Sequence, residues 1–208
     1  MENLKNPTAT EMKYKTVMDD PNTEKYCFAD QYEFMMYAKH CKDAGRTSGG
    51  LIWINDSSYQ EHFKRGYDLF DRGQYEQALT EYMEALKVNP VGIGARFEIC
   101  ECYLKLRRLS DARRALLDMQ EYLIEASYVA RFYRRMSFIA VEQRNYRLAV
   151  ACLLFSMNYE KTPYVAQELM YIQSINGHPV KVSNPQKVIQ SAGIPILKGY
   201  VFTNKKVG

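Results

Sequence analysis

The chain has 208 residues, of which 47% are hydrophobic and 25% are charged, and its formal net charge is +4. This composition is ordinary for a folded globular chain, and it excludes a disordered protein, a collagen and a disulfide-rich scaffold. The sequence lacks both an apolar run of about 20 residues and a signal-peptide pattern at its start, so we expect no membrane span and a cytoplasmic location.

The first 58 residues are expected to precede the main domain. Residues 1–25 are polar and contain two prolines, which favours a flexible N-terminal segment. Residues 30–45 predict a helix that ends in a glycine. The apolar tetrad at 51–54 follows a Gly-Gly pair, and we expect it to pack against the helices that come next. Residues 26–58 are therefore predicted to form an N-terminal helix and capping segment.

An internal repeat begins near residue 59. Four positions align three times, first at an offset of 34 residues and then at an offset of 37 in every case. The aligned positions are Gly66, Cys100 and Ser137; Tyr75, Leu109 and Tyr146; Ala78, Ala112 and Ala149; and Tyr82, Leu116 and Leu153. A constant offset across four positions indicates a repeat architecture. The three extra residues must lie between Leu116 and Ser137.

Each repeat has the pattern of two short helices. In the first one, apolar residues recur at helical spacing from Tyr59 to Asp71, and again from Tyr75 to Leu86. Gly73 separates the two runs, and Pro90 ends the second run. Such a helical hairpin cannot bury its apolar face alone, so the repeats are expected to stack on one another.

The first repeat resembles the tetratricopeptide repeat family. Within that family, the chain resembles the small proteins of the bacterial type. The residues that carry the resemblance, in the order of the family signature, are Gly66, Leu69, Tyr75, Ala78, Tyr82, Ala85 and Pro90. The resemblance implies an all-α fold, a right-handed superhelix of about three repeats. These would occupy residues 59–92, 93–126 and 130–163, followed by a capping helix at 164–177.

The last part of the chain, residues 178–208, is predicted to be a tail. Residues 185–192 could form a short helix, and residues 194–202 form an apolar extended segment. An exposed apolar segment favours aggregation, so it is expected to lie against another surface. That surface could be the binding groove of the same chain or of a neighbouring chain, and self-association is a related possibility.

The resemblance also implies a binding surface. In the family, the first helix of each repeat lines a concave groove that binds extended peptides or partner helices. The residues that would form the groove here are Phe63, Tyr67, Phe70, Phe97, Glu101, Arg131, Arg134, Arg135 and Phe138. Aromatic and arginine side chains favour binding surfaces. We expect an extended ligand with apolar side chains and an acidic or C-terminal carboxylate end; the alternative is that the aromatic residues are core.

The family's carboxylate clamp of Lys, Asn and Arg is only half present. Phe63 and Tyr67 stand where the first repeat of the clamp has Lys and Asn, and Glu98 replaces the next Asn. Arg131 and Arg135 do match the basic pair of the third repeat. Binding of a chaperone C-terminus is therefore not predicted.

The leading prediction is a non-catalytic protein- or peptide-binding adaptor. One alternative is a peptide-sensing regulatory module that acts through a separate protein, and the other is an enzyme that uses Glu98 and Glu101 for acid–base chemistry. No His, Ser or Cys constellation supports catalysis. No cofactor is predicted, and no metal either, because the five cysteines lack ligand spacing.

Arginines are concentrated in one stretch. Between Arg107 and Arg147 there are nine arginines and no lysine, against five acidic residues. Arginine suits bidentate contacts with carboxylate or phosphate, but surface arginines usually form solvated faces and intramolecular pairs. Binding of nucleic acid needs a denser basic stripe and is disfavoured.

Overall fold

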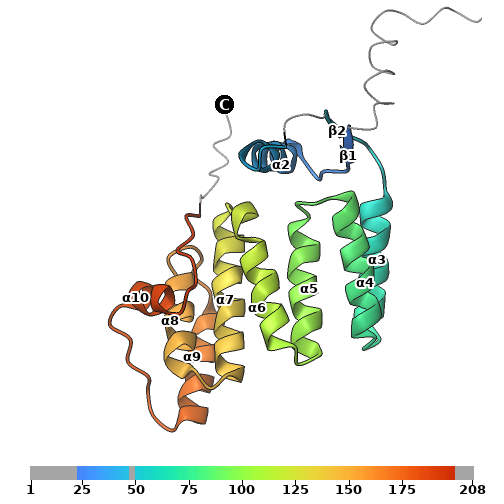
Figure 1. Cartoon of the computed structure of the whole chain (residues 1–208). Coiled ribbons are helices and arrows are strands. Elements are labelled where there is room, and N and C mark those ends of the chain that lie inside the picture. The colour runs from blue at the N-terminus through green and yellow to red at the C-terminus, as the bar shows by residue number, and fades with distance from the viewer. Residues whose placement is uncertain (1–22, 47–49, 200–208) are drawn as a thin grey trace, which may run out of the picture.

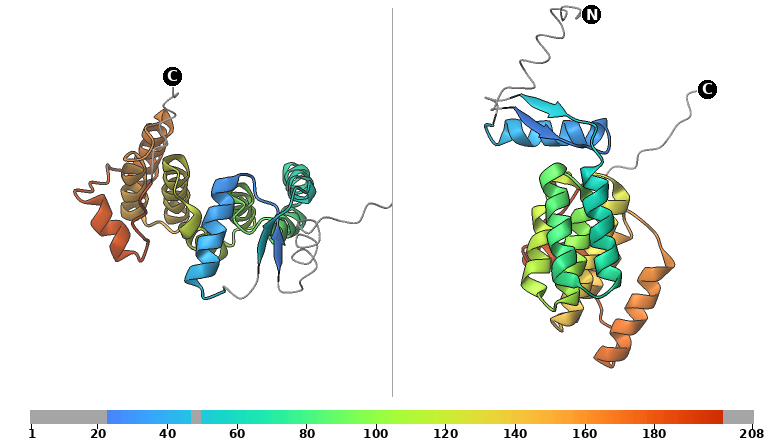
Figure 2. Two further views of the ribbon diagram at one scale, coloured as in Figure 1. Left: turned by 90° about the horizontal axis from the view of Figure 1, so that it is seen from above. Right: turned by 90° about the vertical axis from the view of Figure 1, so that its right-hand side faces the viewer.

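A row of antiparallel helices makes up most of the molecule (Figure 1). The computed structural model describes residues 23–46 and 50–199. The repeat region contains α3 (Ser58–Asp71), α4 (Tyr75–Val88), α5 (Ile93–Lys105), α6 (Leu109–Asp118), α7 (Ala126–Glu142) and α8 (Tyr146–Ser156). They pair as three hairpins, α3 with α4, α5 with α6 and α7 with α8, and seen from above the hairpins follow an arc (Figure 2). The all-α repeat fold predicted from the sequence is confirmed.

Close crossing of the two helices explains the small residues of the repeat. A Cβ atom on Gly66 would lie 2.8 Å from the ring of Tyr82, which is fully buried. In the third hairpin the equivalent Ser137 fits because its hydroxyl donates to the carbonyl of Ala149 at 2.9 Å. Between α3 and α4 the chain turns at Gly73, whose φ of +75° is readily adopted by glycine.

The second and third hairpins are joined by a longer connection than the first and second. After α6 a short 3-10 helix, η1 (Gln120–Tyr122), is inserted. Helix α7 then begins at Ala126, four residues before the third repeat was expected to start, and runs for 17 residues. The extra residues inferred from the change of offset are therefore shared between η1 and the first turn of α7.

The N-terminal region contains a small sheet that the sequence analysis did not predict. Strand β1 (Glu24–Tyr26) pairs in parallel with β2 (Leu51–Trp53). The expectation of a loose segment up to residue 25 is wrong at Glu24 and Lys25; residues 1–22 lie outside the described part. The tetrad at 51–54 pairs with β1, whereas it was expected to pack on the first repeat.

Helix α2 (Gln31–Asp43) lies across the ends of the hairpins (Figures 1 and 2). Asn89, which follows α4, donates to Glu33 at 2.7 Å, and His40 Nδ1 lies 2.8 Å from a carboxylate oxygen of Glu121 in η1. The backbone N–H of Cys27 also donates to the carbonyl of Val88. This region therefore ties together the connections that follow α4 and α6, which is a different role from an end cap.

The C-terminal part adds α9 (Pro163–Asn176) and α10 (Pro185–Ser191). Helix α10 packs against α8, with Ile189 completely buried. Arg113 of α6 donates to the carbonyl of Ala192, and the hydroxyl of Tyr133 donates to the carbonyl of Pro195 at 2.8 Å. The described tail therefore contacts α6, α7 and α8. The sequence analysis had left open that it fills the groove. Residues 200–208 lie outside the described part.

Candidate functional site

Ion pairs join the first helices of the second and third hairpins. On α5, Glu98 and Glu101 are three residues apart and share one face, because a helix repeats every 3.6 residues. On α7, Arg131 and Arg135 share the facing side for the same reason. Arg131 lies 3.1 Å from Glu98, and Arg135 pairs with Glu101. We call this surface, together with the outward side of α3, the first-helix face.

Two of the predicted aromatic residues are exposed. Tyr67 of α3 is 52% exposed and Phe138 of α7 is 37% exposed. Phe138 lies one turn after Arg134 and Arg135, so these three side chains share one side of α7. Arg134 also pairs with Glu160 at 2.7 Å. The face thus presents separate aromatic side chains beside arginines that are held in place.

Of the other three aromatic residues, Phe97 is buried in the core, and Phe63 and Phe70 are half-buried and pack against it. Phe97 is 0% exposed and lies beneath Arg131, whose guanidinium carbon is 4.2 Å from the ring centroid. The prediction that Phe97 contacts a ligand is therefore wrong. Phe63 packs edge-on against Tyr82 inside the first hairpin.

Phe70 has a similar position near the end of α3. Its ring meets that of Tyr75 edge-on at 5.2 Å, and it packs on the cluster of buried residues from α4 and α5. The core alternative holds for Phe97, whereas Phe63 and Phe70 keep part of their surface exposed and their contact with a ligand stays a prediction. Helical spacing could not separate the two roles, because core and groove positions alternate on the same helix.

Burial raises the pKa of Glu101, while the charge of Arg135 beside it acts in the opposite direction. The arginines hold both carboxylates of α5, so neither Glu98 nor Glu101 is free to transfer a proton to a substrate. The buried cysteines are also unsuited to catalysis, since burial raises the pKa of the Cys100 and Cys102 thiols to about 12. This arrangement favours binding over chemistry.

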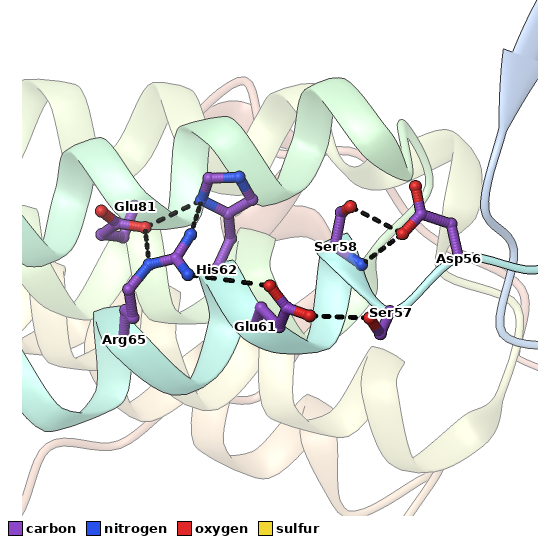
Figure 3. Close-up of polar contacts among 7 residues, drawn as sticks. All are labelled: Asp56, Ser57, Ser58, Glu61, His62, Arg65 and Glu81. Atoms are coloured by element: carbon purple, nitrogen blue, oxygen red, sulfur yellow. Dashed lines mark hydrogen bonds and ion pairs between the residues drawn. The ribbon is translucent and has the colours of Figure 1, made fainter.

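A polar cluster on α3 and α4 was missed by the sequence analysis (Figure 3). His62 Nδ1 lies 2.8 Å from Glu81, and Arg65 donates to the same carboxylate oxygen at 3.0 Å. These two partners hold the pKa of Glu81 below its usual range, with the contact to His62 as the largest cause. Once the hairpin register was known, the pairing of His62 with Glu81 could have been found, because both lie on facing sides of one hairpin.

The cluster also contains two serines, but they are not arranged for catalysis. The hydroxyl of Ser57 donates to Glu61 at 2.7 Å, and that of Ser58 donates to Asp56 at 2.6 Å (Figure 3). A serine nucleophile needs its hydroxyl to face a base such as an imidazole. Here both hydroxyls face carboxylates that begin the helix, so the cluster is a helix-starting and hairpin-joining network.

Most arginines of the 107–147 stretch form ion pairs, as the sequence analysis expected. Six of the nine do so: Arg107, Arg108, Arg114, Arg131, Arg134 and Arg135. Arg113, Arg144 and Arg147 form none with the described residues.

Among all residues that the structure describes, no group of three His, Cys, Asp or Glu residues is placed to hold a metal ion. None of the described helices is long and apolar enough to cross a bilayer.

Comparison with known proteins supports the repeat assignment. Residues 69–132 match the family model described as tetratricopeptide repeat. A region of 94 residues, 43% of this chain, is 26% identical to the Hsp70-Hsp90 organising protein of Plasmodium falciparum. The match spans only 17% of that relative's length. This relative is eukaryotic, so it gives no support to the bacterial type expected from the sequence.

A solved structure has a similar fold. It is described as the first TPR of Spaghetti (RPAP3) bound to the HSP90 peptide SRMEEVD. The TM-score is 0.51 at 15% sequence identity, and the match covers 60% of this chain and 97% of that one. At this identity the likeness concerns the fold alone.

Proposed function

Since residues 69–132 match the tetratricopeptide-repeat family model, we propose that the chain is a non-catalytic adaptor that binds an extended peptide on its first-helix face. The observation that carries the proposal is the combination on this face of exposed Tyr67 and Phe138 with the arginines of α7. Tyrosine and arginine are enriched among residues that dominate binding energy. The fold neighbour was solved with a peptide bound, which supports a peptide ligand in general terms.

The arginines define the polar part of the ligand. Arg131 and Arg135 are each about one-third exposed while pairing with a glutamate of α5. A guanidinium has five N–H donors, so one carboxylate leaves donors for a second one. The glutamates fix the arginine side chains in advance, which lowers the entropy lost on binding. We propose that Arg131, Arg134 and Arg135 receive an acidic side chain or the C-terminal carboxylate of the peptide.

The aromatic residues define the apolar part. Tyr67 and Phe138 lie on α3 and α7, with α5 between them, so one ligand that contacts both must be extended. We propose that its apolar side chains contact these two rings. A chaperone C-terminus such as SRMEEVD would meet Phe63, Tyr67 and Glu98 where the clamp of the family has Lys and Asn, so it would lack the contacts that those residues make. We therefore propose that the ligand is held by the arginines of α7 and the two exposed rings, without a complete clamp.

The experiment is a selection from a library of peptides with free C-termini, followed by fluorescence polarisation with the selected peptides. We expect at least one peptide with apolar residues before an acidic or carboxylate end. Tyr67→Ala/Arg134→Ala should weaken its binding about tenfold or more, because it removes one apolar and one polar contact. Amidation of the peptide C-terminus should weaken binding if the carboxylate itself is recognised, whereas an acidic side chain would make amidation harmless.

The matched control is Tyr171→Ala/Arg72→Ala, which removes the same residue types from positions outside the face. Tyr171 is exposed on α9 and Arg72 is exposed in the turn after α3. This variant should keep the wild-type affinity. Equal affinity of the two double variants would remove Tyr67 and Arg134 from the site. Tight binding of SRMEEVD would show that the clamp substitutions do not prevent chaperone recognition.

A further inference from the structure

Two basic residues that form no ion pair with the described residues lie at one place, between α8 and the tail. Arg147 in the first turn of α8 forms no ion pair or hydrogen bond with any described residue, and this residue is exposed. Lys187 of α10 has no partner for its ammonium group among the same residues. Both line one cavity of about 460 Å³. By contrast, the arginines on the first-helix face are each neutralised by a glutamate.

The lining of this cavity suits an oxyanion. It contains no acidic residue; its polar groups, besides the two cations, are the hydroxyl of Ser183, the side-chain amides of Asn145 and Asn184, and the hydroxyl of Ser191, which donates to the carbonyl of Lys187. The amide oxygens of both asparagines already accept backbone N–H groups, so their NH₂ groups remain as donors. A guanidinium and an ammonium with hydroxyl and amide donors are the groups that bind phosphate oxygens.

A third positive charge lies at the rim. Arg113 of α6 donates to the carbonyl of Ala192, which also lines the cavity, and it forms no ion pair. The positive potential of the cavity is therefore not cancelled by any carboxylate that lines it. Arg147 and Lys187 are exposed and Arg113 is half-buried, and an anion that enters the cavity is attracted by all three charges.

The size and the floor of the cavity indicate more than a free phosphate ion. Small-molecule sites typically have volumes of about 300–1,000 Å³. The apolar part of the lining, which we call the apolar floor, consists of Leu148 of α8 with Val188 and Ala192 of the tail. A molecule that carries one phosphate group and a small organic part would place the phosphate against the cations and the organic part against this floor.

From this geometry we propose that the cavity between α8 and α10 binds a small phosphate monoester through Arg147 and Lys187. The site is separate from the proposed peptide site and does not depend on it. Its two sides come from positions about 40 residues apart in sequence, the start of α8 and the tail. A ligand that contacts both would hold α10 on α8 and stabilise the folded chain by mass action.

The test is calorimetric titration of the full chain with glycerol 3-phosphate and with inorganic phosphate, at constant ionic strength so that screening does not differ between samples. We expect saturable binding of both, with the monoester tighter because it also contacts the apolar floor. Arg147→Gln/Lys187→Gln should weaken monoester binding at least about tenfold, the usual effect of losing hydrogen bonds to charged groups. Arg147→Lys/Lys187→Arg keeps the charges and should bind with intermediate affinity.

The matched control is Arg72→Gln/Lys181→Gln, which removes the same two charges from exposed positions outside the cavity lining. It should bind like the wild type. Equal weakening in both double variants would show non-specific attraction to a basic chain and overturn the proposal. No saturable binding of either probe would overturn it as well, and a monoester that binds no tighter than inorganic phosphate would overturn the role of the apolar floor. Thermal melts of all variants identify any that fail to fold.

Discussion

The first and the third hairpins have the same architecture but are stabilised differently. The first hairpin, α3 with α4, has the family signature, and its core is a small cluster centred on Tyr82, Ala78 and Leu79. The third hairpin, α7 with α8, is joined to a larger core that also contains Ile189 and Ile194 of the tail. In a stacked array each unit relies on its neighbours. The core of the first hairpin is completed by Ala95, Ile99 and Cys102 of α5, within the repeats, whereas the third hairpin also depends on chain from outside the repeats.

The largest expected effect tests this dependence. Ile189→Ala removes a completely buried side chain from the contact between α10 and α8 and should lower the free energy of unfolding by about 2–5 kcal/mol. Hydrogen exchange should accelerate in α8 and stay nearly unchanged in α4. The control Ile175→Ala changes an exposed residue of α9 and should have little effect. Equal acceleration in α4 and α8 would mean that the solenoid unfolds as one unit.

The next effect compares one position in both hairpins. Gly66→Ala places a methyl group 2.8 Å from the buried ring of Tyr82 and should cost about 1–3 kcal/mol through overpacking. Ser137→Ala at the equivalent position removes only a hydroxyl that donates to a helix carbonyl, and should cost about 1 kcal/mol or less. Chemical denaturation measures both. If Ser137→Ala were the more costly change, close crossing would not be the reason for the small residue.

The smallest effect concerns the pH dependence of the first hairpin. The pKa of Glu81 is lowered in the folded chain by His62 and Arg65, so the stabilisation is complete above the ordinary value of 4.5 and is lost as the pH falls through the lower folded value. Glu81→Gln should cost up to about 1 kcal/mol at neutral pH. The difference from wild type should shrink as the pH falls from 5 to 3 in denaturant titrations. A difference that stays constant over this range would exclude the charge of Glu81 as its cause.

Much of the architecture could be read from the chain alone. The spacing of Gly66, Cys100 and Ser137 located the helix crossings, and the shift from 34 to 37 placed the extra residues between Leu116 and Ser137, where η1 and the longer α7 lie. Gly177, with a φ of +81°, ends α9 where the sequence placed the end of a helix. These features depend on local backbone preference and on helical periodicity, which are properties of neighbouring residues.

The sites depended on contacts between distant residues, and only the tertiary structure decided them. Helical spacing put Phe97 and Phe138 in one predicted surface, but packing buries the first and exposes the second. The pairing of β1 with β2 and the cavity between Arg147 and Lys187 each join segments that are far apart in sequence. The sequence by itself determined which segments become helices and how they repeat. Burial and charge pairing are set by which segments meet, and that is a property of the folded chain as a whole.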